Sequence, residues 1–190
     1  MSSFKDAIAL QTQGGPVRRL NKNETLTVRF LYEMDDKDRG WAYLLGMFNE
    51  DINRTEYVET SSPNADRITR SKGYRNHYFA VAVAEDSNEA EVLELRASMA
   101  KALAEYDDEY GSITDRSYKL KRRGEGLDTE YIATPLEKES PSDRLKKIKR
   151  NSDGLLRDSL NALLSIYEDD TVKPEKEEEA DESLALEWDD

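Results

Sequence analysis

Short segments in which apolar and polar residues alternate are the feature that most constrains the fold of this 190-residue chain. The alternation is strongest over residues 77–84, and over 24–30 it places Leu26, Val28 and Phe30 on one face. A period of two residues is typical of a β-strand with one buried face. Similar signals predict four further strands, over residues 41–48, 91–95, 117–122 and 129–134.

Helical spacing appears in two later parts of the chain. A helix is predicted over residues 99–110, with Ser98 as its N-cap and Gly111 as its stop. Ser142 is expected to start a basic helix, which residues 151–154 separate from a further helix. One stripe of that last helix is apolar and holds Leu156, Leu160, Leu163 and Leu164.

Five or six short strands with one helix inserted late favour a small, curled barrel over a sandwich or a parallel sheet. We therefore expect a mainly β protein with added helices (α+β), and the five-stranded oligonucleotide-binding barrel (OB-fold) fits the strand count. The expected organisation is an N-terminal arm over residues 1–23, an OB-fold domain over 24–137, a helical segment over 138–167 and a disordered acidic tail over 168–190. Within the OB-fold domain, the polar residues 49–73 are expected to form a long loop with at most a short helix.

The charge of the chain is divided unevenly along its length. Residues 168–190 contain twelve acidic residues and two lysines, so this segment has a net charge of −10 out of −13 for the whole chain. The remainder is nearly balanced, and its basic residues form two clusters: Arg67, Arg70, Lys72 and Arg75, and Arg116, Lys119, Lys121, Arg122 and Arg123. A basic working surface joined to an acidic tail indicates a protein that handles polyanions.

Composition argues against several kinds of chemistry. The chain has no cysteine and one histidine, His77, so neither a zinc site nor cysteine catalysis is expected, and we expect no cofactor or metal ion. No phosphate-binding loop or dinucleotide motif occurs, so we do not expect an enzyme. No apolar run approaches the roughly 20 residues that span a bilayer, and no signal-peptide pattern is present. We therefore expect an intracellular protein without a membrane partner.

Residues 113–131 are the densest candidate for a binding site. Strand alternation divides them into two faces, one with Tyr118, Leu120 and Arg122 and the other with Lys119, Lys121 and Arg123. Single-stranded nucleic acid binds where bases stack on aromatic rings, for about 1–3 kcal/mol per base, and where Lys and Arg neutralise phosphates. The alternative is an ordinary hairpin whose basic residues are solvated.

A second candidate begins before the strand predicted at 77–84. The basic residues at 67, 70, 72 and 75 interleave there with Tyr74, Tyr78 and Phe79. We expect Tyr74 and Arg75 at the rim of a nucleic-acid groove and Phe79 in the core. The alternative is that these basic residues only solvate a loop.

Two other segments have the composition of a binding surface. Trp41 and Tyr43 are candidates for base stacking, although one of the two is equally suited to the core. The basic helix over 143–150 offers phosphate contacts or a docking site for the acidic tail, or it is a solvated helix face.

The end of the acidic tail combines apolar residues with acids, namely Leu184, Leu186 and Trp188 with Asp189 and Asp190. A short segment of this kind suits a hydrophobic pocket with a basic rim on a partner protein. We expect the tail to recruit replication or recombination proteins, because a tail that only confers solubility does not need the three apolar residues.

The segment TDRSYKLKRRGEGLDTEY, residues 114–131, resembles a glycine-centred motif of tailed-phage single-stranded DNA-binding proteins, relatives of the T-even helix-destabilising protein. The matching positions are Thr114, Asp115, Arg116, Tyr118, Leu120, Arg122, Gly124, Gly126, Leu127, Asp128, Thr129 and Tyr131. Residues 28–33 and 76–86 resemble that family in order and spacing as well. The resemblance implies an OB-fold barrel that coats single-stranded DNA during phage replication, recombination and repair. The zinc ligands and the basic N-terminal cooperativity motif of the T-even protein are not evident in this chain, so neither is carried over.

The predicted function is sequence-tolerant binding of single-stranded DNA by a non-enzymatic protein of the host cytoplasm, compatible with self-association. Phosphates are expected on the two basic clusters, and bases on Tyr118, Tyr131, Tyr74 and Trp41. One alternative is an acidic adaptor or DNA mimic that binds a nucleic-acid enzyme and not DNA. Another is a magnesium-dependent nuclease that uses the acidic residues at 35–36 or 107–109.

Overall fold

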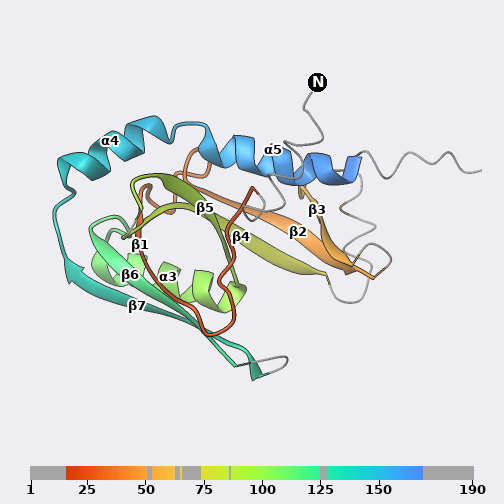
Figure 1. The fold of residues 1–190 in the computed structure, drawn as a ribbon, viewed down its shortest axis with the longest axis horizontal. Helices are drawn as coiled ribbons and strands as arrows, with labels where there is room; N and C mark the ends of the chain where they lie inside the picture. Colours follow the sequence, from red (N-terminus) through yellow and green to blue (C-terminus); the bar gives the residue numbers. More distant parts are fainter. Residues whose placement is uncertain are drawn as a thin grey trace, which may run out of the picture.

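The computed structural model describes residues 16–50, 53–62, 65, 74–85, 87–124 and 128–168. Within this part of the chain, seven strands form one sheet with antiparallel pairing, accompanied by three helices (Figure 1). The strands are β1 (Thr25–Phe30), β2 (Trp41–Asn49), β3 (Arg54–Val58), β4 (Arg75–Ala84), β5 (Ala90–Leu95), β6 (Arg116–Arg123) and β7 (Glu130–Lys138). The helices are α3 (Ala97–Tyr110), α4 (Asp143–Asn151) and α5 (Leu155–Glu168). The predicted class, mainly β with added helices, is confirmed.

Strand β4 is the centre of the sheet. Its first residues pair with β2 and its last three with β1, while its opposite edge pairs with β5. The sheet continues from β1 through β6 to β7, and from β2 to β3. Residues 79–84 are buried on both faces of β4, since α5 lies against β3, β4 and β5.

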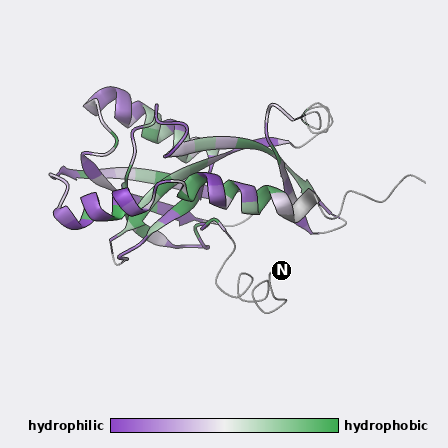
Figure 2. Cartoon of the chain, turned by 90° about the horizontal axis from the view of Figure 1, so that it is seen from above, coloured by the Kyte–Doolittle hydropathy of each residue, from purple (hydrophilic) through white to green (hydrophobic). Residues whose placement is uncertain are grey.

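One hydrophobic core joins the sheet to the helices. Met99 and Leu103 on α3, Ile148 on α4, and Leu156 and Leu163 on α5 are all buried in it. Figure 1 shows α4 and α5 end to end along the top of the view, with α3 lower down beside β6 and β7. In Figure 2, α4 is mostly hydrophilic and α5 is mixed, as expected of helices with one buried stripe.

Two of the three predicted helix caps are confirmed. The Ser142 hydroxyl accepts a hydrogen bond from the Leu145 amide at 3.3 Å, so it is the N-cap of α4 as predicted. Gly111 ends α3 with a φ of 74°, as predicted. The prediction for Ser98 is wrong, because α3 begins at Ala97 and has no side-chain N-cap.

Two segments that were expected to be irregular belong to the sheet or the core. Strand β3 lies inside the predicted loop 49–73 and pairs with β2, and its Tyr57 is buried. Val17 and Leu20, from the predicted N-terminal arm, are also buried. Between them, the Arg18 amide donates to the Val92 carbonyl oxygen at 2.8 Å, so these residues lie along β5.

Candidate nucleic-acid interface

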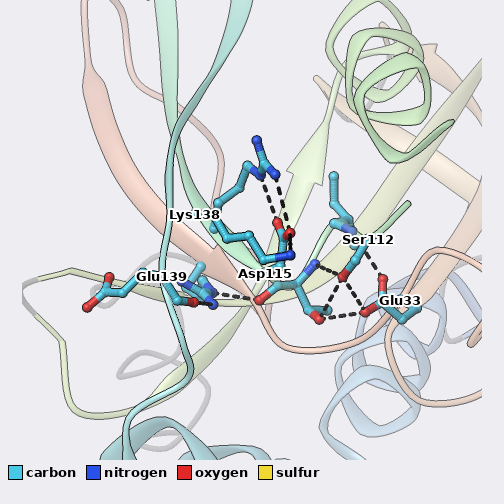
Figure 3. Close-up of polar contacts among 9 residues, drawn as sticks. Glu33, Ser112, Asp115, Lys138 and Glu139 are labelled. Atoms are coloured by element: carbon cyan, nitrogen blue, oxygen red, sulfur yellow. Dashed lines mark hydrogen bonds and ion pairs between the residues drawn. The ribbon is translucent and has the colours of Figure 1, made fainter. Parts of the chain in front are cut away.

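A network of polar contacts fixes the point where β6 begins (Figure 3). The carboxylate of Glu33 accepts hydrogen bonds from Ser112 Oγ at 2.8 Å, from the Ile113 amide at 3.1 Å and from Thr114 Oγ1 at 2.5 Å. These bonds hold the turn between α3 and β6 against the segment that follows β1. Thr114, the first residue of the phage-like motif, is thus bound within the fold.

Asp115 ties the same end of β6 to the end of β7. Its carboxylate contacts Arg116 at 2.7 Å and Lys138 at 3.1 Å, and the hydrogen bond from Arg116 helps to lower the pKa of Asp115 to about 2. The Arg116 guanidinium also lies 3.7 Å from the ring centroid of Tyr110, and its side chain is only 12% exposed. Arg116 makes these internal contacts at the start of β6, and its predicted role in phosphate binding stays a prediction.

Two of the predicted stacking residues belong to the core. Tyr118 is fully buried, with its ring 5.6 Å from that of Phe30, and Trp41 is 6% exposed. The Trp41 indole donates a hydrogen bond to the Tyr32 carbonyl oxygen at 2.9 Å. Neither ring presents a face to a base, so the prediction that Tyr118 and Trp41 stack on DNA is corrected.

A groove that combines basic and aromatic side chains lies where β4, the β5–α3 junction and the β6–β7 hairpin meet. It has a volume of about 750 Å³ and is lined by Tyr74, Arg75, Asn76, Tyr78, Arg96, Ala97, Ser98, Arg122, Thr129 and Tyr131. None of these lining residues is acidic. We call this feature the arginine–tyrosine groove, after its three arginines and three tyrosines.

Tyr131 is at the centre of these contacts. It lies directly opposite Arg122 in the β6–β7 register, and the guanidinium carbons of Arg122 and Arg96 are 5.7 and 5.9 Å from its ring centroid. Gly124 makes the turn of this hairpin possible, since its φ is +77° and a Cβ there would collide with the carbonyl oxygen of Asp128. The hairpin therefore delivers an aromatic ring and an arginine to the same place.

A buried polar cluster supports the groove from behind. The Glu94 carboxylate contacts Arg19 at 2.5 Å and His77 at 2.7 Å, and it accepts a hydrogen bond from Tyr57 at 3.1 Å. Burial alone would raise the pKa of Glu94, but the His77 hydrogen bond and the Arg19 charge hold it at about 2. Gly46 leaves room for this cluster, because a Cβ there would come within 2.7 Å of the His77 ring.

The cluster reaches the groove through a smaller adjoining pocket, which is lined by Arg19, Leu20, Glu94, Arg96, Arg122 and Tyr131. Nη1 of Arg122 donates to the Leu20 carbonyl oxygen at 3.0 Å, and this bond orients Arg122. His77, expected to be a strand residue without a chemical role, is a structural partner of Glu94.

One exposed aromatic residue of β2, Tyr43, extends the groove. Tyr43 is 51% exposed and lies opposite Tyr78 in the β2–β4 register, with ring centroids 6.3 Å apart. Since Tyr78 lines the groove, Tyr43 is placed to lengthen its aromatic side. Phe48, further along β2, is 55% exposed and was not among the predicted residues.

The remaining predicted residues lie elsewhere. Tyr74 is 44% exposed and lines the groove with Arg75, Arg122 and Tyr131, as expected of a common site. Lys119, Lys121 and Arg123 are on the opposite face of β6 from the buried Tyr118 and Leu120, so they point away from the core. Arg67, Arg70, Lys72, Leu184, Leu186, Trp188, Asp189 and Asp190 lie outside the described residues.

Sequence reasoning missed Arg96 and Arg19. Arg96 is exposed at the junction of β5 and α3, and it is isolated from both basic clusters in the sequence. The sequence did contain one signal for Arg96, namely its position between a predicted strand and a predicted helix. A residue at such a junction lies at the edge of a sheet. Arg19 belonged to the supposed arm, and only its contact with Glu94 shows its place.

Among the residues that the structure describes, no group of three or more His, Asp or Glu side chains is arranged to hold a metal ion. In the same part of the chain, no helix is long and apolar enough to cross a membrane.

No protein-family model matches the sequence, and a search of curated proteins finds no match either.

Proposed function

We propose that this protein is a non-enzymatic single-stranded DNA-binding protein. The bound DNA strand would lie in the arginine–tyrosine groove. One observation carries the proposal: three arginines and three tyrosines from three separate segments converge on one hollow, and none of its described lining residues is acidic. Arginines neutralise phosphates of any sequence, and aromatic rings stack on any base. Such a groove favours single strands, whose bases are free to stack, and it tolerates different sequences.

The strand pairing supports an OB-fold reading of the sheet. Strands β1, β4, β5, β6 and β7 would be the five barrel strands, with α3 between the third and the fourth and the β2–β3 hairpin as an insertion after the first. The barrel would close between β5 and β7, where Arg96 lies over the ring of Tyr131. OB-folds bind oligonucleotides on strands 2 and 3 and on the loops after strands 1 and 4, and the groove is lined from the corresponding places.

The biological role follows from the resemblance of residues 114–131 to phage single-stranded DNA-binding proteins. The protein would coat and protect single strands during phage replication, recombination and repair in the host cytoplasm. Its acidic segment 168–190 would recruit replication proteins through Leu184, Leu186 and Trp188.

Titration of labelled poly-dT at several salt concentrations tests this function. Three groove arginines on phosphates predict a slope of log K against log salt of about −2, and steeper if the lysines on the outer face of β6 take part. A duplex of the same length should bind more weakly, because its bases are not free to stack. Equal affinity for duplex, or no salt dependence, would contradict the proposal. Binding to a nucleic-acid enzyme without any binding to poly-dT would favour the acidic adaptor.

A further inference from the structure

A second hollow with a basic lining lies near the start of β6, between β1 and α4. It has a volume of about 230 Å³, and its lining consists of Arg29, Lys146 and Lys149 together with Thr114 and four apolar residues. None of these described lining residues is acidic. The hollow shares no lining residue with the arginine–tyrosine groove, so it is a separate place on the molecule. We call it the Arg29 pocket.

Arg29 is buried in the wall of this pocket without a carboxylate in contact. The residue is 4% exposed. Its Nε and Nη2 atoms donate to the carbonyl oxygens of Thr114 at 2.8 Å and Glu139 at 2.6 Å, and these two bonds fix the plane of the guanidinium group. Nη1 is buried as well, and among the described residues it has no hydrogen-bond partner. The nitrogen without a partner is therefore held in a fixed position beside the pocket.

A buried cation in this state is costly. Burial lowers the pKa of Arg29, and the charges of Glu139 and Asp115 oppose that effect only in part. The Asp115 carboxylate is already paired with Arg116 and Lys138. A water molecule would accept a hydrogen bond from Nη1 but would bring no charge, so an anion offsets the cost more fully.

Two lysines of α4 add to the positive charge of the pocket. Lys146 and Lys149 are three residues apart, so they lie on the same side of the helix. Lys146 also pairs with Asp143 at 3.1 Å, but the Asp143 side chain is 98% exposed, and an ion pair at the surface contributes little. The pocket thus combines three cations with apolar walls, which strengthen the attraction of these cations for an anion.

We propose that the Arg29 pocket binds a phosphate dianion, either inorganic phosphate or the phosphate end of a nucleotide. A terminal phosphate has a charge of about −1.5 to −2 at neutral pH and three acceptor oxygens, so it matches Arg29, Lys146 and Lys149 together. A carboxylate has a single charge and two oxygens, and a phosphodiester inside a DNA strand likewise has a single charge. Either of these would leave more of the positive charge unmatched.

A neighbouring hollow provides room for the rest of a nucleotide. It has a volume of about 600 Å³, shares Lys146 and Lys149 with the pocket, and is also lined by Tyr32, Arg39, Arg150 and Asp153. The phosphate site goes beyond the proposed function, because it requires no DNA in the arginine–tyrosine groove.

An NMR titration of the isotope-labelled full-length protein with sodium phosphate tests the proposal. We expect saturable shifts of the backbone amide signals of residues 29–31 and 145–149, and of the side-chain Nε–H signal of Arg29. Sodium chloride at the same ionic strength should leave these signals in place. No saturable shift at residues 29–31, or an equal shift with chloride, would overturn the proposal.

Two neighbouring lysines on α4 provide a matched pair of variants. Lys146 lines the pocket, whereas Lys147 does not, and both are exposed. Lys146→Gln should weaken phosphate binding by about 3- to 5-fold, as expected for the loss of one partly solvated charge. Lys147→Gln, with the same change in net charge, should leave the affinity unchanged. Equal affinities of the two variants would show that the phosphate binds elsewhere.

Further probes separate the sources of the phosphate group. Tighter binding of thymidine monophosphate than of inorganic phosphate would identify a nucleotide as the ligand, and the reverse order would identify free phosphate. A dT oligonucleotide with hydroxyl ends should shift the groove signals of residues 129–131 and leave those of 29–31 in place.

Two results with these probes would contradict the proposal. A shift at residues 29–31 as large with the hydroxyl-ended oligonucleotide as with thymidine monophosphate would show that the pocket takes backbone phosphates. Tighter binding of a tri-glutamate peptide than of either phosphate would show a carboxylate site for a protein partner. The poly-dT affinity is measured independently, so failure of the phosphate site does not count against DNA binding in the groove.

Discussion

Replacement of Tyr131 by alanine is the most direct test of the groove, because this ring is the point on which two arginines converge. Arg96 and Arg122 lie 5.9 and 5.7 Å from its centroid, on strands or junctions that are far apart in sequence. Under the proposed function, a base that stacks on this ring would lie beside two cations. Removing it deletes the stacking surface and also the common support of both guanidinium groups.

The expected loss follows from the energy of base stacking. Alanine substitution of an aromatic residue that stacks on a base costs about 1–3 kcal/mol, which corresponds to about a 5- to 150-fold weaker affinity. No charge is removed, so the slope of log K against log salt should stay within about 0.3 of the parent value. Tyr131 is half-buried, and we expect a loss of roughly 1–2 kcal/mol in the free energy of unfolding as well.

Tyr110→Ala is the matched control. Tyr110 is also half-buried and also supports an arginine, Arg116, but it does not line the groove. Fluorescence anisotropy of a labelled dT oligonucleotide gives the affinity of each variant, and urea denaturation gives its stability. If Tyr131→Ala binds as tightly as the parent, or if Tyr110→Ala loses as much affinity at equal stability, the assignment of the groove is wrong.

Three further predictions concern the groove and the cluster behind it. Arg96→Ala should weaken dT binding and reduce the salt slope by about 0.7, and an unchanged slope in the same titration would mean that this arginine meets no phosphate. Glu94→Gln should cost about 3 kcal/mol of stability at neutral pH, since a fall in pKa from 4.5 to about 2 favours the folded state above the unfolded pKa. That contribution disappears as the pH falls from about 4.5 to about 2, so urea denaturation should show a flatter acid dependence in the variant; parallel pH profiles would rule the argument out. Gly46→Ala should destabilise the fold by about 1–3 kcal/mol, because the new methyl group meets His77, and an unchanged urea midpoint would show that the ring moves aside freely.

The sequence predicts best those features that depend on neighbouring residues. The β6–β7 hairpin, the cap at Ser142 and the stop at Gly111 each rest on a few adjacent side chains and their backbone preferences. Strand β3 was missed because its five residues are mostly polar and its pairing with β2 is a contact that only the fold supplies. Its buried Tyr57 owes its place to the Glu94 cluster, which joins segments distant in the sequence.

The face that a side chain presents is the feature that the sequence leaves undecided. Trp41 and Tyr43 are two residues apart on β2, yet Trp41 is 6% exposed and Tyr43 is 51% exposed. The difference comes from their surroundings, since Trp41 packs against Phe30 where β1 and β2 both meet β4. Arg29 shows the converse, a charged residue at an outward position of an alternating strand that is buried by Thr114 and Glu139. Whether a strand residue is buried depends on which other elements cover that face of the strand. The alternation of apolar and polar residues does not contain this information.

Different parts of the phage-like motif, residues 114–131, have different structural roles. Its first three residues, 114–116, are bound to Glu33, Lys138 and Tyr110, so they fix the start of β6. Tyr118 and Leu120 fill the core, and among the described residues of the motif Arg122, Thr129 and Tyr131 line the groove. Much of this segment therefore holds the hairpin in place, and only part of it serves the groove. A variant at residues 114–116 that loses DNA binding must therefore also be tested for stability before the loss is assigned to a contact with DNA. Changes at Arg122 and Tyr131, in contrast, act on the groove itself.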